Sequence, residues 1–163
     1  MTFAVLGPGS ALEMDTVQLG GVDRTVRKTS ARLAAAARLT IRERIQTDGR
    51  DTARTDFTVS MDGDGSAVNL ISRSVARGSS RQTYRSRLMG NCRCSGHSEC
   101  DAILMDRGRV DAFPELIAGC RDVSLIHEAA IGRIAGEQIV KLRTLGLSEE
   151  AAERRIIEGF LNG

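Results

Sequence analysis

Aromatic residues are nearly absent from this chain of 163 residues, which has no tryptophan, one tyrosine and an aromatic content of 3%. A protein that stacks nucleic-acid bases on aromatic side chains is therefore not expected. The charge balance points the same way, because 23 Lys and Arg residues are offset by 21 Asp and Glu residues. Nothing in the net charge favours a polyanionic partner, so we expect no nucleic acid to bind.

Long apolar runs are also missing. No segment approaches the roughly 20 apolar residues that cross a bilayer, and the first residues lack the basic and apolar regions of an export signal. Four cysteines without an export signal favour reduced thiols, available for metal binding or reaction, over disulfides. We therefore expect a cytoplasmic protein with no membrane partner.

Several catalytic motifs are absent. The sequence contains no Gly-x-x-x-x-Gly-Lys-Ser/Thr loop, no His-Glu-x-x-His pair and no Gly-x-Ser-x-Gly elbow, and it has only two histidines. No catalytic motif is therefore recognisable, and we do not expect a stand-alone enzyme.

Glycine is frequent, with 17 residues, whereas proline occurs only twice. Between the glycines, apolar and polar residues alternate in short runs, as in 57–61, 68–72, 84–88 and 100–104. Alternation of this kind, bounded by Gly, Asn and Asp, predicts β-strands. The inward positions are small or medium aliphatic residues, which suits a β-solenoid better than a β-sandwich. The sandwich remains the alternative, since no fixed repeat is visible.

Residues 24–39 are ambiguous, because their alanine run favours a helix on propensity but also fits a tight bend between strands. We favour a strand over 37–45. After residue 126 the apolar residues recur at helical spacing from Ile131 onward. Gly146 is placed to end a first helix, and Ser148 to cap a second one that carries Glu149 and Glu150 in its first turn. This predicts a helical hairpin, with a β domain over 1–124 and a helical region over 125–163.

Two groups of residues have metal-binding chemistry. Cys92, Cys94, His97 and Cys100 lie within nine residues and could hold zinc or an iron–sulfur cluster. Alternatively, Cys92 and Cys94 are small core residues and His97 is an exposed loop residue, with a turn at Gly96. The second group, His127-Glu128, could supply an imidazole and a carboxylate at the junction of the β body and the helices, or could simply open a helix.

Several segments resemble the C-terminal core of the SufB/SufD (SufBD) scaffold family. They are residues 98–105, 111–116, 127–134, 137–139, 145–151 and 156–160. The resemblance implies a right-handed parallel β-helix followed by helices, and a role in building iron–sulfur clusters. It places the cluster and iron site at Cys100, His127 and Glu128.

The resemblance also implies partners. A family member pairs through its β-helix with itself or with a SufD-like chain, and a sulfur donor protein is a further expected partner. The family docks a SufC-like ABC ATPase on its C-terminal helices. We expect this dock to involve Ile131, Ile134, Gln138, Leu142, Ile156 and Phe160. The other hypotheses are an ATPase-docking module without a cluster and a small zinc-binding β protein.

Overall fold

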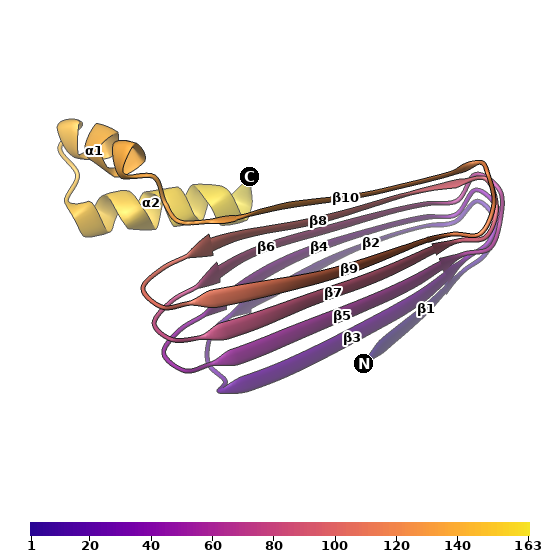
Figure 1. The fold of residues 1–163 in the computed structure, drawn as a ribbon, viewed down its shortest axis with the longest axis horizontal. Coiled ribbons are helices and arrows are strands. Elements are labelled where there is room, and N and C mark those ends of the chain that lie inside the picture. The colour runs from indigo at the N-terminus through magenta and orange to yellow at the C-terminus, as the bar shows by residue number, and fades with distance from the viewer.

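The structure is a computed structural model that describes residues 1–163, with ten strands followed by two helices (Figure 1). The strands are β1 (Thr2–Leu6), β2 (Ala11–Leu19), β3 (Arg24–Leu33), β4 (Arg38–Thr47), β5 (Thr52–Met61), β6 (Ala67–Ala76), β7 (Arg81–Gly90), β8 (Cys94–Leu104), β9 (Arg109–Ala118) and β10 (Val123–Gly132). The helices are α1 (Gly136–Thr144) and α2 (Glu149–Asn162). No helix is both long and apolar enough to cross a membrane.

The strands form two parallel sheets, one with the order β1-β3-β5-β7-β9 and the other with the order β10-β8-β6-β4-β2. Each turn of the chain therefore adds one strand to each sheet, and Figure 1 shows the turns stacked side by side. This is a parallel β-solenoid followed by two helices, as the sequence predicted. The partner of Arg38 in β4 is Ala67 in β6, and the partner of Ala67 is Ser95 in β8. Across all the strand pairs a turn takes 27 to 29 residues, a period that exists in the backbone although no sequence repeat reveals it.

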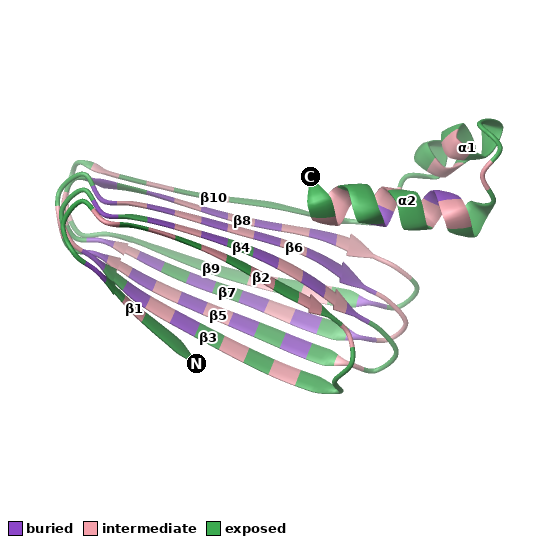
Figure 2. Cartoon of the chain, turned by 180° about the vertical axis from the view of Figure 1, so that it is seen from behind, coloured by how far each residue is buried: buried purple, intermediate pink, exposed green.

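The core lies between the two sheets and consists mainly of small and medium residues from the inward positions of each strand. Figure 2 shows the buried positions recurring along the central strands. Phe57 and Tyr84 are the only aromatic residues of the core cluster. The predicted strand alternation is confirmed in β5, β6, β7 and β8. Because the sheets are close and many layers are stacked, aliphatic side chains fill this core without large aromatic anchors.

The ambiguous alanine run forms neither a helix nor a strand throughout. Residues 24–33 belong to β3, and the alanines that follow make the turn into β4. The next turn packs directly on this one, since a Cβ atom added at Gly63 would lie 2.0 Å from the backbone nitrogen of Ala35. Turn stacking therefore requires glycine at position 63, beside the backbone of the alanine turn.

The boundary predicted at residues 124–125 is wrong. β10 continues to Gly132 and pairs with β8 along its whole length, so the helical region begins only at Gly136. His127 and Glu128 consequently lie within a strand and not at a helix start. The apolar spacing from Ile131 onward resembled a helix, but pairing with an existing sheet edge overrides this local signal.

α1 ends and α2 begins where the sequence predicted. Gly146 has a left-handed φ of 94° after α1, and the side chain of Ser148 accepts a hydrogen bond from the backbone N–H of Ala151 at the start of α2. α2 buries Ala152 and Ile157, whereas α1 has no buried residue. α1 packs against α2 and lies away from the sheets (Figure 1).

A buried carboxylate lies inside the solenoid. Glu43 on β4 is fully buried and accepts hydrogen bonds from Thr55 at 2.8 Å, Ser72 at 3.2 Å and Arg27 at 2.9 Å. Burial raises the pKa of Glu43, while these donors act in the opposite direction. The guanidinium of Arg27 is partly exposed and supplies the only cation within ion-pair distance of Glu43.

Replacing Arg27 by Met leaves the carboxyl group of Glu43 buried without its cation. We expect Arg27→Met to lower the free energy of unfolding by about 3 kcal/mol, measured by urea denaturation. The double variant Arg27→Met/Glu43→Gln removes the uncompensated charge and should lose less than the single variant. Equal losses in both variants would show that the ion pair is not the source of the effect.

Candidate functional site

The predicted site residues lie on the last two strands of one sheet. Cys100 is on β8, and His127 and Glu128 are on β10. The parallel register places Ser98 opposite His127 and Glu99 opposite Glu128. Since successive residues of a strand point to opposite faces, His127 and Glu128 lie on different sides of the sheet.

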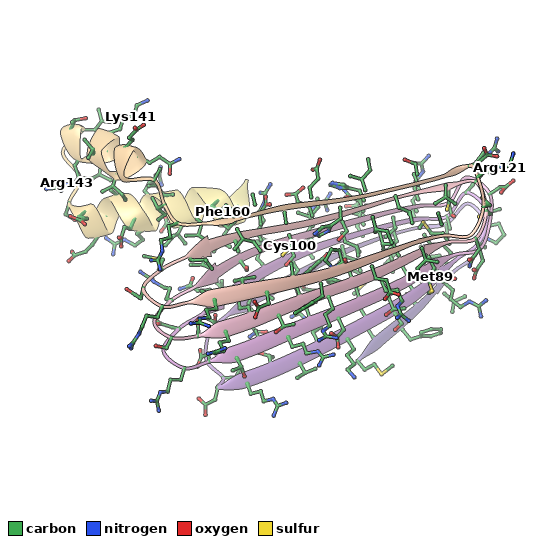
Figure 3. All side chains as sticks on the ribbon, viewed as in Figure 1. Met89, Cys100, Arg121, Lys141, Arg143 and Phe160 are labelled. Carbon is green, nitrogen blue, oxygen red and sulfur yellow. The ribbon has the colours of Figure 1, made fainter.

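The thiol of Cys100 points into the solenoid, between the two sheets (Figure 3), and the residue is only 1% exposed. Burial is the main cause that raises the pKa of Cys100 to about 12, and the nearby carboxylates of Asp101 and Glu43 act in the same direction. The thiol is therefore protonated in the single chain at neutral pH. It becomes a good nucleophile or metal ligand only when a cation or partner compensates its charge.

His127 shares the inner face with Cys100. Its Nδ1 lies 3.2 Å from the hydroxyl oxygen of Ser98, and its ring stacks on Tyr84 with centroids 6.4 Å apart. Burial lowers the pKa of His127, which favours the neutral imidazole that binds metal ions. The hydroxyl groups of Tyr84 and Ser98 are 2.9 Å apart, and Ser98 also donates to Ser86 at 3.0 Å. These contacts with residues of the preceding solenoid layer fix the position of the His127 imidazole.

The turn that carries His127 is the last of the solenoid, and no further turn covers its inner face. Leu116 on β9 and Ile131 on β10 occupy inward positions, yet each is 38% exposed. Cys100 therefore lies one layer below an open end of the core, and His127 lies in the end layer itself.

A second group of side chains lies on the outer face of the same sheet. The Nε2 atom of His97 is 3.3 Å from a carboxylate oxygen of Glu128, and Glu99 completes a group whose ligand atoms all lie within 4.8 Å of one another. Burial raises the pKa of Glu99, and its neighbour Asp101 adds to the shift. Glu128 thus faces His97 and Glu99, while Cys100 and His127 share the opposite face.

The four-ligand hypothesis for Cys92, Cys94, His97 and Cys100 is not supported by the geometry. Cys94 and Cys100 are buried on the inner face, whereas His97 is on the outer face of the same strand, three residues from each. The predicted turn at Gly96 is wrong, because β8 runs through it. A Cβ atom there would lie 2.7 Å from Leu125, so Gly96 is an inner-face position without room for a side chain.

His97 is therefore a strand residue, and the expectation that it lies in an exposed loop is corrected. Glu99, and Asn69 on β6, which is the hydrogen-bond partner of His97, were not recognised as candidates from the sequence. The i, i+2 spacing of His97 and Glu99 in a strand would place both on one face. The contribution of Asn69 depends on a strand register that the sequence does not show. Cys120 lies in the turn before β10 and is half-buried.

Taken together, the fold and site define a parallel β-solenoid with an open end, a buried thiol beneath that end and a helical tail. The sequence model of the family described as "SUF system FeS cluster assembly, SufBD core domain" matches residues 1–160. The chain belongs to this SufBD family.

Curated relatives carry the same family name. An "Iron-sulfur cluster assembly SufBD family protein" of Methanothermobacter thermautotrophicus is 38% identical over 106 residues, which cover 64% of this chain and 26% of the relative. The Archaeoglobus fulgidus protein of that name is 39% identical over 101 residues, which cover 61% of this chain and 27% of the relative. A Mycobacterium tuberculosis relative is 34% identical over 97 residues, which cover 57% of this chain and 12% of the relative. The matched part is about a quarter of the length of the two archaeal relatives.

The four thiols should differ in their accessibility to alkylating reagents. In the folded chain we expect Cys92 and Cys120, which are half-buried, to react with iodoacetamide well before Cys94 and Cys100, which are buried. Mass spectrometry of partially labelled protein measures the order, and labelling in urea provides the control in which all four react. Labelling of Cys100 as fast as Cys120 would contradict the buried, protonated thiol.

Proposed function

We propose that this chain is a scaffold subunit on which iron–sulfur clusters are assembled, with iron and sulfur as its substrates. The observation that carries the proposal is the thiol of Cys100 lying one layer below an open solenoid end, with the neutral imidazole of His127 in the layer above. A thiol and an imidazole are ligands that suit iron. The buried thiol ionises only when a cation is nearby, which suits a transient cluster better than permanent storage.

The open end also supports the proposal that the chain pairs with a second copy or with a SufD-like chain. The exposed inner-face residues Leu116 and Ile131 would be covered by a partner, as would the unpaired edges of β9 and β10. The same pairing would exclude water from Cys100 and His127. A sulfur donor protein would have to act before or during this closure, because a partner would cover the open end above the thiol.

The C-terminal helices are the proposed dock for a SufC-like ABC ATPase. α1 leaves Val140 59% exposed and Leu145 72% exposed, although both are apolar. Leu142, Ile156 and Phe160 are half-buried, and Gln138 is exposed. Ile134 precedes α1, and Ile131 lies on the inner face of β10, at the strand end that leads to these helices.

Cluster formation should depend on Cys100. Anaerobic reconstitution of the full chain with sulfide and a mixture of ferrous and ferric iron, in the presence of a SufC-like ATPase, should produce visible cluster absorbance, because a thiolate ligand is available once iron compensates its charge. Cys100→Ser should lose most of this absorbance. Cys120→Ser, which changes a thiol in the turn before β10, is the matched control and should retain it.

The outcome also separates the two scaffold hypotheses. Absence of any cluster in the wild type, with the ATPase still bound, would sink the assembly role and leave an ATPase-docking module.

ATPase capture should depend on the exposed apolar face of α1. We expect Val140→Glu to reduce co-purification of a SufC-like ATPase roughly tenfold or more, because a carboxylate would be buried without a partner in the complex. The control is Val26→Glu on β3, which places the same change at an exposed valine on the solenoid. Equal losses from both variants would argue against a dock on the helices.

A further inference from the structure

The outer-face group has the composition and arrangement of a metal site separate from Cys100. His97 and Glu99 are two residues apart on β8, so they share one face, and the register places Glu128 of β10 directly beside Glu99. The strand pairing that builds the solenoid therefore brings one imidazole and two carboxylates together. Further charges border the group: Asp101 follows on the same face of β8, and Arg73 on β6 lies 4.0 Å from Glu99.

Asn69 determines which nitrogen of His97 faces the carboxylates. Its side-chain oxygen lies 2.9 Å from Nδ1 of His97, and an amide oxygen can only accept, so Nδ1 carries the proton. In the neutral ring, Nε2 then carries no proton, and its lone pair faces the carboxylate oxygen Oε2 of Glu128, which lies 3.3 Å from Nε2. Two acceptors in this position need a proton or a metal ion between them, and the proton can sit on the ring or on the carboxyl group. Orientation of a ligand histidine by a second hydrogen bond is typical of metal sites.

The spacings fit a single ion. Two ligand atoms that are each about 2.1 Å from a metal at a tetrahedral angle lie about 3.4 Å apart, close to the 3.3 Å between His97 and Glu128. The widest spacing in the group, up to 4.8 Å, exceeds this tetrahedral spacing, so at least one carboxylate has to move closer when an ion binds. The Glu128 side chain is largely exposed, so it has room to rotate and bring its carboxylate closer to the other ligands.

We propose that His97, Glu99 and Glu128 bind a divalent first-row transition-metal ion on the outer face of the solenoid. One nitrogen and two oxygen ligands without a thiolate suit Fe(II), and also Co(II) or Zn(II), better than a Cys-bound cluster. Three protein ligands leave coordination positions for water, so the ion remains exchangeable. If the proposed assembly function is correct, the ion is the Fe(II) substrate, received on the side of β8 opposite to the thiol of Cys100.

The test is anaerobic calorimetric titration of the full chain with Fe(II) and with Co(II), without sulfide. We expect one ion to bind, and His97→Gln and Glu128→Gln each to weaken binding roughly tenfold or more. Glu13→Gln, which changes an exposed carboxylate on β2 of the same sheet, should bind as the wild type does. Thermal unfolding verifies that each variant is folded. If one of the two ligand variants does not fold, the other still tests the site.

The Co(II) form distinguishes the outer site from the inner one. An ion bound by nitrogen and oxygen ligands has no thiolate-to-cobalt charge-transfer band in the near ultraviolet, and Cys100→Ser should leave its affinity unchanged. A thiolate band, loss of binding in Cys100→Ser, normal binding in both ligand variants, or no binding by the wild type would each overturn the proposal.

The assembly function can fail separately. Stoichiometric Fe(II) binding that depends on His97, combined with no cluster after sulfide and ferric iron are added, would refute the assembly function and leave the metal site standing. Conversely, normal cluster formation by a wild-type chain that binds no Fe(II) before sulfide would refute the metal site alone.

Discussion

The parallel pairing of strands that are one solenoid turn apart is the constraint on which the rest of the structure depends. It fixes a spacing of 27 to 29 residues between partners, as from Ala11 to Arg38, from Ala67 to Ser95 and from Arg38 to Ala67. It gives every strand one face toward a narrow core and one toward solvent. It also stacks the turns so closely that Gly63 has no space for a Cβ atom beside Ala35. Small residues at these contacts are therefore a consequence of the stacking.

The same pairing separates the chemistry into two compartments. On the inner face, Cys100 and His127 lie in successive layers beneath an open end, in surroundings that keep the thiol protonated and the imidazole neutral. On the outer face, His97, Glu99 and Glu128 gather where water and ions have access. The side chains of adjacent residues such as Glu99 and Cys100 thus lie on opposite faces of the sheet. A partner chain on the open end would change the inner compartment much more than the outer one.

Much of the fold could be predicted from the sequence because the signals were local. Alternation predicted the central strands, the lack of aromatic residues favoured a narrow core, and Gly146 and Ser148 marked the helix ends. The end of the last strand could not be predicted in this way. Ile131 has the spacing of a helical apolar stripe, but β8 offered an unpaired edge, and ten residues of β10 pair with it.

The sequence by itself determined that the chain is mainly β, that a helical pair follows, and that Cys100, His127 and Glu128 are candidates for metal chemistry. Only the tertiary structure decided how these residues are grouped. It placed Glu128 with His97 and Glu99, and it left His127 with Cys100. The physical reason is that a strand's own sequence fixes which residues share a face, whereas the register with its neighbour fixes which side chains meet across strands. That register is set by the stacking of whole turns, which no local pattern records.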